Sequence, residues 1–184
     1  IIDGAVGHDL RISSGRRSGG KCFQLNPPDF NQSESFELDR NFLTESASSL
    51  RFHVRKGFAT TTTVLSCQVS TDGGSSWTSI WTKVGDNSSQ SSYEQVDLSL
   101  AAFPDQSLRL KFEVRHLGNS LYTTGGASLG FRIDDISLSN TSIEVSTRLT
   151  NLEQNEQFSV NESTAGNPLS VGESYLVKVR PTVG

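Results

Sequence analysis

Cysteine is scarce in this chain of 184 residues, which has only Cys22 and Cys67. Two cysteines permit one disulfide but do not require it. In LSCQV, Cys67 lies on the same alternating face as the leucine and the valine, and we predict that it points inward. In KCFQL, Cys22 alternates with Phe23 and Leu25, which we predict to be the inward pair. The two sulfurs are therefore expected to face different ways. A bridge needs close, well-aimed Cβ atoms, so both a disulfide and two free thiols remain open.

Basic excess, long apolar runs and catalytic motifs are also absent from the sequence. The 16 lysines and arginines against 20 aspartates and glutamates give a net charge of −4, which does not favour nucleic acid as a partner. No apolar run approaches the roughly 18 residues of a membrane span. His8, His53 and His116 lie in three separate segments, and no nucleophile elbow, HExxH or phosphate-binding loop occurs. We expect no enzymatic activity, although two acids suffice for a glycosidase and a hidden pair stays open.

Period-two alternation of apolar and polar residues is the main pattern that is present. In SLRLKFEVR (107–115), four apolar residues alternate with charged ones, and SLRFHVRK (49–56) repeats the pattern. Similar alternation predicts further strands over 35–43, 63–70, 78–84, 94–100 and 130–139. Turn-rich segments separate them, and no dozen residues show a helical stripe. We predict an all-β fold, a two-sheet antiparallel sandwich with one solvated face per sheet.

The stretch STDGGSSW (70–77) lies between two of the predicted strands. Asp-Gly-Gly supplies the positive φ that hairpin turns require, and the Asp72 carboxylate can accept bonds from the amides of the turn. The spacing S-x-D-x-G-x-S-W also resembles the Asp-box, a structural hairpin motif in which the tryptophan packs under the turn. We therefore interpret the stretch as a turn and not as a catalytic or metal loop.

Three motifs follow one another in an order found in a known family. VSTDGGSSW is followed by VDLSLAAFPDQSLRLKF and then by the closing GFRIDDI. Over about residues 8 to 139, this order resembles the MAM-like jelly-roll domains appended to bacterial secreted peptidases and polysaccharide-degrading enzymes. The resemblance implies a jelly-roll sandwich, an extracellular or cell-surface location and a bound structural calcium. It fixes no ligand, because one fold serves many functions.

Asp134 and Asp135, adjacent in FRIDDIS, are the first candidates for calcium ligands. Paired acids in a strand directed toward the core are costly unless they are solvated, hydrogen-bonded or metal-bound, and calcium takes several oxygen ligands. The resemblance implies that acids of this closing strand meet an early loop. The candidates in that early part of the chain are Asp29 and Asn31, with Asp9 and Asp3 further back. In the alternative, one aspartate faces solvent while the other caps a loop by accepting bonds from its amides.

A ligand surface is expected on the sheet that, by the resemblance, holds SLRLKFEVR beside ESFELD, VLSCQVS and TSIWTKV. Its outward candidates are Glu37, Arg109, Lys111 and Arg115, with Asp39, Ser66, Gln68 and Glu113 alongside. Trp81 can join them or turn inward, depending on the register of the hairpin. An aromatic beside fixed polar groups suits a sugar ring, although charged cross-strand neighbours are also the ordinary covering of a solvated sheet. Tyr122, in the loop GNSLYTTGGAS, is a second aromatic candidate, because loops often carry function.

The other sheet is expected to carry a basic stripe, made of Arg51, His53, Arg55 and Arg132. This stripe could meet an anionic polysaccharide or only keep the surface soluble.

Two functions from different classes follow. The first is a non-catalytic extracellular module that binds carbohydrate, for which an acidic polysaccharide is one option, and that targets a linked enzyme. The second is a structural or adhesive spacer that contacts neighbouring domains and no free ligand. In either case we expect a monomer that is a piece of a longer secreted protein. We expect 1–142 to be the jelly roll, and 143–184 to be a short C-terminal β extension or a fragment of a fibronectin type III-like neighbour, because GESYLVKVRPTVG is typical of the last strands of such a module.

Overall fold

The structure is a computed structural model, and it describes residues 2–3, 10–26, 31–118 and 129–144. The chain divides into two compact units, residues 1–142 and 143–184. The second unit lies almost wholly outside the described residues, so its fibronectin-like character stays a prediction. The account below concerns the first unit.

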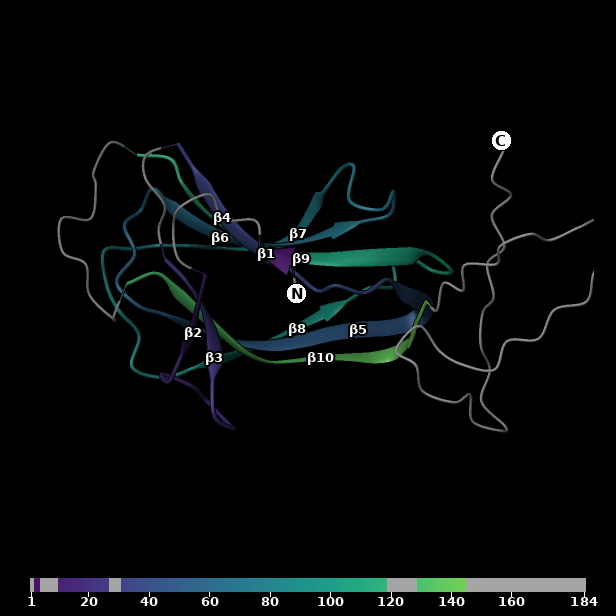
Figure 1. The fold of residues 1–184 in the computed structure, drawn as a ribbon, viewed down its shortest axis with the longest axis horizontal. Coiled ribbons are helices and arrows are strands. Elements are labelled where there is room, and N and C mark those ends of the chain that lie inside the picture. Colours follow the sequence, from purple (N-terminus) through teal and green to yellow (C-terminus); the bar gives the residue numbers. More distant parts are fainter. Residues whose placement is uncertain (1, 4–9, 27–30, 119–128, 145–184) are drawn as a thin grey trace, which may run out of the picture. The chain divides into compact units, whose positions relative to one another are not determined.

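The regular elements of the described residues are all strands (Figure 1). They are β1 (Ile2–Asp3), β2 (Leu10–Ser13), β3 (Cys22–Leu25), β4 (Ser33–Glu37), β5 (Phe42–Lys56), β6 (Thr63–Ser70), β7 (Thr78–Val84), β8 (Glu94–Ser99), β9 (Ser107–His116) and β10 (Phe131–Ile143).

The strands form two layers, which lie one above the other in Figure 1. One layer has the order β7-β6-β9-β4-β1 and the other the order β8-β5-β10-β3-β2, with antiparallel pairing in both. The start of β5 also pairs with β9, Phe42 opposite Leu108, so the layers are joined at this corner. The predicted all-β, two-sheet antiparallel sandwich is confirmed, and β4, β6, β7 and β9 share one layer as expected.

One predicted strand was wrong. Residues 35–43 do not form a single strand, because β4 ends at Glu37 and β5 begins at Phe42. Between them, the Arg40 amide donates to the Leu38 carbonyl at 2.8 Å, which closes a three-residue turn. The chain passes from one layer to the other at this turn, so the alternation that continues through it belongs to two strands.

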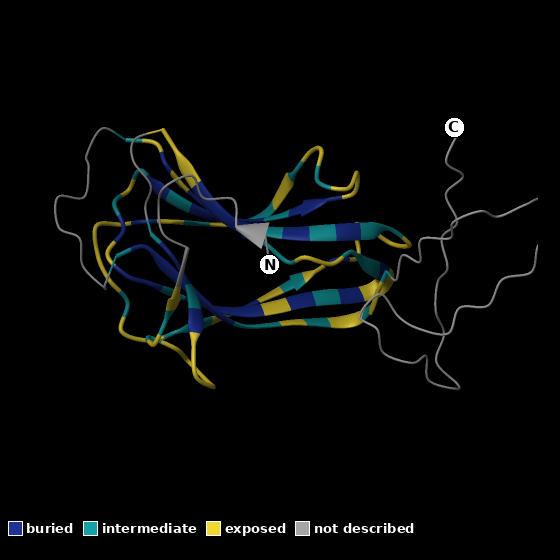
Figure 2. Cartoon of the chain, viewed as in Figure 1, coloured by how far each residue is buried: buried dark blue, intermediate teal, exposed yellow. Residues whose placement is uncertain are grey.

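The core follows from the alternation of side chains along the strands. On β9, Leu108, Leu110, Phe112 and Val114 are buried and the residues between them are half-buried, except Arg115, which is exposed; Figure 2 shows the same banding. A row of aromatic rings crosses the core from Phe23 through Phe36, Phe112 and Phe52 to Trp81, with centroids 4.5 to 5.2 Å apart. Each such contact contributes about 0.5–1.5 kcal/mol beyond the area that it buries.

The two cysteines are buried and free. Cys67 lies in the core, whereas Cys22 faces away from it and donates to the Ser13 carbonyl at 3.5 Å. Phe23 and Leu25, the neighbours of Cys22 on β3, pack into the core as predicted. The sulfurs therefore face different ways, and of the two alternatives the structure has free thiols. Burial raises the pKa of the Cys67 thiol to about 12.

Candidate functional site

The outer face of β4, β6, β7 and β9 is built from the residues that alternate with the core. Because the strands are antiparallel and in register, these outward side chains form rows across the sheet. From β4 to β6, the rows are Ser33–Arg115–Val64, Ser35–Glu113–Ser66 and Glu37–Lys111–Gln68, and Arg109 lies beside Ser70. We call these residues, together with Trp77, the polar face.

Arg109 and Lys111 are held in place by several partners each. Arg109 Nη2 donates to Glu37 Oε2 at 2.7 Å, and its Nη1 donates to the Gly73 carbonyl at 2.9 Å. Lys111 Nζ lies 3.3 Å from Glu113 Oε2 and 4.5 Å from the centroid of the Trp77 ring. The side chain of Lys111 is only 12% exposed. An ammonium over a tryptophan ring is attracted by the electron-rich face of the ring.

A bulge in the β6–β7 hairpin decides whether Trp81 belongs to the polar face. Cys67 lies opposite Trp81, but Gln68 lies opposite Ser79, so Ile80 is an extra residue on β7. One extra residue reverses the side-chain alternation. Trp81 therefore turns inward and meets Phe52 edge-on at 5.2 Å, while half-buried Trp77 contacts Lys111. Of the two positions left open for Trp81, the inward one is found.

Trp77 was not considered as a ligand contact from the sequence, because the Asp-box pattern placed it under the turn. It does lie against the turn: a Cβ added to Gly74 would be 3.6 Å from Trp77 Cζ2 and 3.0 Å from Arg109 Nη1. Its position beside Lys111 depends on the pairing of β6 with β9, which are distant in the sequence. No local signal in the sequence indicates that position.

The STDGGSSW stretch is a turn, as predicted. Asp72 Oδ1 accepts a bond from the Ser76 amide at 2.9 Å and from the Ser70 hydroxyl at 2.7 Å. The Ser76 hydroxyl and amide, followed by the Ser70 hydroxyl, hold the pKa of Asp72 well below its usual range. Gly73 and Gly74 have φ angles of 77° and 98°, a region that favours glycine. The carboxylate is occupied by the turn itself.

The other residues that the sequence predicted to contact a ligand are Arg115, Tyr122 and those of the basic stripe. Arg115 is exposed on β9, two rows from Lys111. Tyr122 lies outside the described residues. The expected basic stripe on the other layer is interrupted, because His53 and Arg132 are buried and only Arg51 is exposed, where it pairs with Asp97 at 2.5 Å.

A loop over residues 14–20, here called the strap, packs on the outer face of the second layer and explains this burial. The Gly15 carbonyl of the strap accepts bonds from the Tyr93 hydroxyl at 2.7 Å and from Arg55 Nη2 at 3.1 Å. A Cβ added to Gly15 would be 2.7 Å from Arg132 Nε. The strap therefore lies directly on the arginines that the sequence predicted to be open to a ligand.

Asp134 and Asp135 hold the strap. Asp134 Oδ2 accepts bonds from the amides of Arg17, at 2.7 Å, and Ser18, at 3.2 Å. Asp135 accepts a bond from the Ser18 hydroxyl and one from Arg17 Nη1 at 2.6 Å, and these two donors lower the pKa of Asp135. Neighbours on a regular strand point to opposite faces. The left-handed φ of 50° at Asp135 breaks that alternation, so both carboxylates reach the strap.

The oxygens of these two aspartates do not fit a calcium site in this arrangement, because backbone amides, a hydroxyl and a guanidinium already bind them. Asn31 donates its amide to the His116 carbonyl at 2.9 Å, and Asp3 lies opposite Phe36; both belong to the other layer. Within the described ranges, no three His, Cys, Asp or Glu side chains gather as a metal site would require. Asp29 and Asp9 lie outside those ranges, so calcium stays a prediction from the resemblance.

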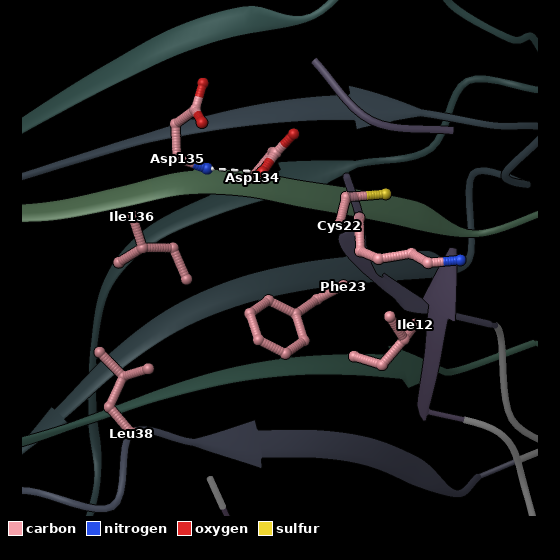
Figure 3. A pocket seen from close by; sticks show the side chains of 8 residues that line it. Ile12, Cys22, Phe23, Leu38, Asp134, Asp135 and Ile136 are labelled. Atoms are coloured by element: carbon pink, nitrogen blue, oxygen red, sulfur yellow. Dashed lines mark hydrogen bonds between the residues drawn. The ribbon is translucent and has the colours of Figure 1, made fainter. Parts of the chain in front are cut away.

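A pocket of about 310 Å³ opens beside the two aspartates (Figure 3). It is lined by Ile12, Lys21, Cys22, Phe23, Leu38, Asp134, Asp135 and Ile136. Figure 3 shows both aspartates on one side of the β10 ribbon and Ile136 on the other, beside Leu38 and Phe23. The acids of this pocket are engaged by the strap, which leaves mainly apolar walls. Its residues come from four separate segments, so the sequence did not indicate it.

The two histidines that the structure describes are both buried away from solvent. His53 is buried with Nδ1 3.8 Å from Asp135 Oδ2, and His116 is buried with Nδ1 3.2 Å from the Thr63 hydroxyl. His8 lies outside the described residues. In the part of the chain that the structure describes, no helix is long and apolar enough to cross a membrane.

Comparisons with known proteins give similar folds but no family. No family model matches the chain, and no curated protein matches it. Among solved structures, the carbohydrate-binding module TmCBM61, in complex with β-1,4-galactotriose, is similar with 15% identity over 69% of this chain and 75% of that chain and a TM-score of 0.40. The K3 cleaved adhesin domain of Lys-gingipain from Porphyromonas gingivalis has 14% identity over 65% and 74%, with a TM-score of 0.43.

A family 16 carbohydrate-binding module is also similar, with 13% identity over 70% of this chain and 82% of that chain and a TM-score of 0.40. Likeness at this level concerns the fold alone. The resemblance to MAM-like domains rests on the sequence motifs.

Proposed function

We propose that the chain is a non-catalytic module that binds carbohydrate on the polar face and holds a linked enzyme near a polysaccharide. The observation that carries this proposal is the Trp77 ring beside a group of fixed donors and acceptors. Gln68 Nε2 donates to Glu113 Oε1 at 3.2 Å, Glu113 pairs with Lys111, and Arg109 pairs with Glu37. A sugar offers an apolar ring face for stacking and hydroxyls that need directed hydrogen bonds.

The ion pairs of Arg109 and Lys111 also favour ligand binding because they immobilise these two side chains. Side chains that are already immobilised lose little conformational entropy when a ligand arrives. Lys111 is 12% exposed and Arg109 is 21% exposed, and each is held by an ion pair. The MAM-like motifs support an extracellular or cell-surface location in a bacterial protein. We propose that the module is monomeric.

The alternative function is a structural or adhesive spacer without a free ligand. It is favoured by the same ion pairs, because charges that neutralise one another are also the ordinary covering of a solvated sheet. The two functions differ in whether the polar face binds a glycan.

Affinity electrophoresis against a panel of neutral and acidic polysaccharides tests the proposal. We expect one or more polysaccharides to retard the protein, and we expect Trp77→Ala and Lys111→Ala to abolish most of the retardation. Trp77→Phe keeps an aromatic ring, so this variant should keep more of the retardation than Trp77→Ala. Phe58→Ala and Arg51→Ala, which alter an exposed aromatic and an exposed arginine outside the polar face, are the matched controls.

Thermal melts of each variant establish that it is folded. If no polysaccharide of the panel retards the wild-type protein, the proposal is wrong and the spacer function takes its place. Equal loss in the Trp77 variants and in the controls would also contradict a site on the polar face.

A further inference from the structure

The three outward cations of β9 differ in how they are neutralised. Arg109 lies 2.7 Å from a Glu37 oxygen, and Lys111 lies 3.3 Å from a Glu113 oxygen. Arg115 is exposed, and its cross-strand neighbours, Ser33 and Val64, are uncharged. Among the described residues of the polar face, there are therefore three cations, all on β9, and two carboxylates. The polar face has a surplus positive charge at its Arg115 end, although the whole chain has a net charge of −4.

The surroundings of Arg115 leave its guanidinium accessible. Ser33 and Val64 have short side chains, and Val84, the next residue of that row, is 52% exposed. A guanidinium presents a planar fork of N–H donors that fits a carboxylate or a sulfate group through two parallel bonds. The nearby serine hydroxyl can supply a further donor, and the two valines can contact the C–H face of a sugar.

The two ends of the polar face are well separated. Arg109, which contacts the turn that carries Trp77, precedes Arg115 by six residues of β9, or about 20 Å at roughly 3.3 Å per residue. A single sugar cannot reach both ends, so a ligand that uses Trp77 and Arg115 together is an oligosaccharide or a longer chain.

We infer that the polar face selects an anionic glycan, whose carboxylate or sulfate binds Arg115 while another ring of the same chain contacts Trp77. This inference rests on the proposed carbohydrate binding, and it adds the ligand class and the residue that selects it. Because the charge at Arg115 is exposed, its attraction for the ligand should weaken with added salt.

Two pairs of polysaccharides, matched except for charge, provide the test. Polygalacturonate is compared with its methyl-esterified form, and dextran sulfate is compared with dextran; the two pairs distinguish a carboxylate from a sulfate. We expect Arg115→Gln to weaken binding of the acidic member roughly tenfold or more, the scale of a hydrogen bond to a charged group. The variant should also reduce the salt dependence and leave binding of the uncharged member unchanged. Arg51→Gln, an exposed arginine on the other layer, is the control.

The outcomes separate this inference from the proposed function. Suppose that Trp77→Ala abolishes glycan binding but Arg115→Gln changes neither the affinity for the acidic member nor its salt dependence. The polar face then binds glycans, and the inference that Arg115 selects an anionic ligand is wrong. The same holds if neither acidic member binds while a neutral polysaccharide of the broader panel does. If no polysaccharide binds the wild-type protein, both proposals fall.

Discussion

Replacing Asp134 by alanine should destabilise the protein by detaching the strap from β10. The carboxylate accepts three backbone amides, from Arg17 at 2.7 Å, Ser18 at 3.2 Å and Asp135 at 2.9 Å, and the residue is only 9% exposed. A hydrogen bond to a charged group contributes about 1.5–3 kcal/mol. The strap amides can regain water when the carboxylate is lost, because Arg17 and Ser18 are exposed. We therefore expect a net loss of about 2–4 kcal/mol for Asp134→Ala.

The assay is thermal unfolding with and without a calcium chelator. A loss of this size corresponds to a fall of roughly 5–15 °C in the melting midpoint for a domain of this length. Asp134→Asn keeps an acceptor without the charge, and its midpoint should fall by about half as much. If the carboxylate serves only to hold the strap, the chelator changes the midpoints of the wild type and of Asp134→Ala by the same amount. Asp97→Ala, which removes an exposed ion pair with Arg51, should hardly move the midpoint.

Two results would refute this reasoning. An Asp134→Ala midpoint within about a degree of the wild type would mean that the three bonds do not hold the strap. A wild-type midpoint that falls with chelator, combined with no chelator effect in Asp134→Ala, would show instead that Asp134 binds calcium, as the resemblance implies.

Three further predictions concern the turn, the acid stability and the thiols. Gly74→Ala should lower the free energy of unfolding by about 1–3 kcal/mol in a denaturant melt, because φ is 98° at this position. Gly20→Ala, whose added Cβ would have nothing within 4 Å, should lower it little, and equal losses in the two variants would contradict this. The bond from buried Lys56 lowers the pKa of Asp86 to about 2, so its stabilisation is present above the unfolded pKa of about 3.9 and is lost as the pH falls toward 2. Asp86→Asn should flatten this acid dependence of the midpoint, and an unaltered slope would argue against the pairing. A thiol reagent should label neither cysteine in the native protein and both after unfolding without reductant; no labelling after unfolding would indicate a disulfide.

The sequence predicted most of the fold because side-chain alternation is a local property of a strand. SLRLKFEVR alone shows which residues of β9 face the core and which face outward, and the Asp-Gly-Gly turn follows from the conformational freedom of glycine. The outward positions of Glu37, Arg109, Lys111 and Arg115 could therefore be predicted before the structure was known. Their partners could not all be predicted, since Arg109 meets a carbonyl of the hairpin turn.

Only the tertiary structure decided the features that depend on a break in alternation or on a distant segment. The extra residue Ile80 turns Trp81 into the core, and the left-handed Asp135 lets both aspartates bind the strap. A sequence pattern reports the direction of a side chain only while the strand stays regular. Whether a residue is accommodated as a bulge depends on the packing of neighbouring strands, which the chain brings together from far apart in the sequence.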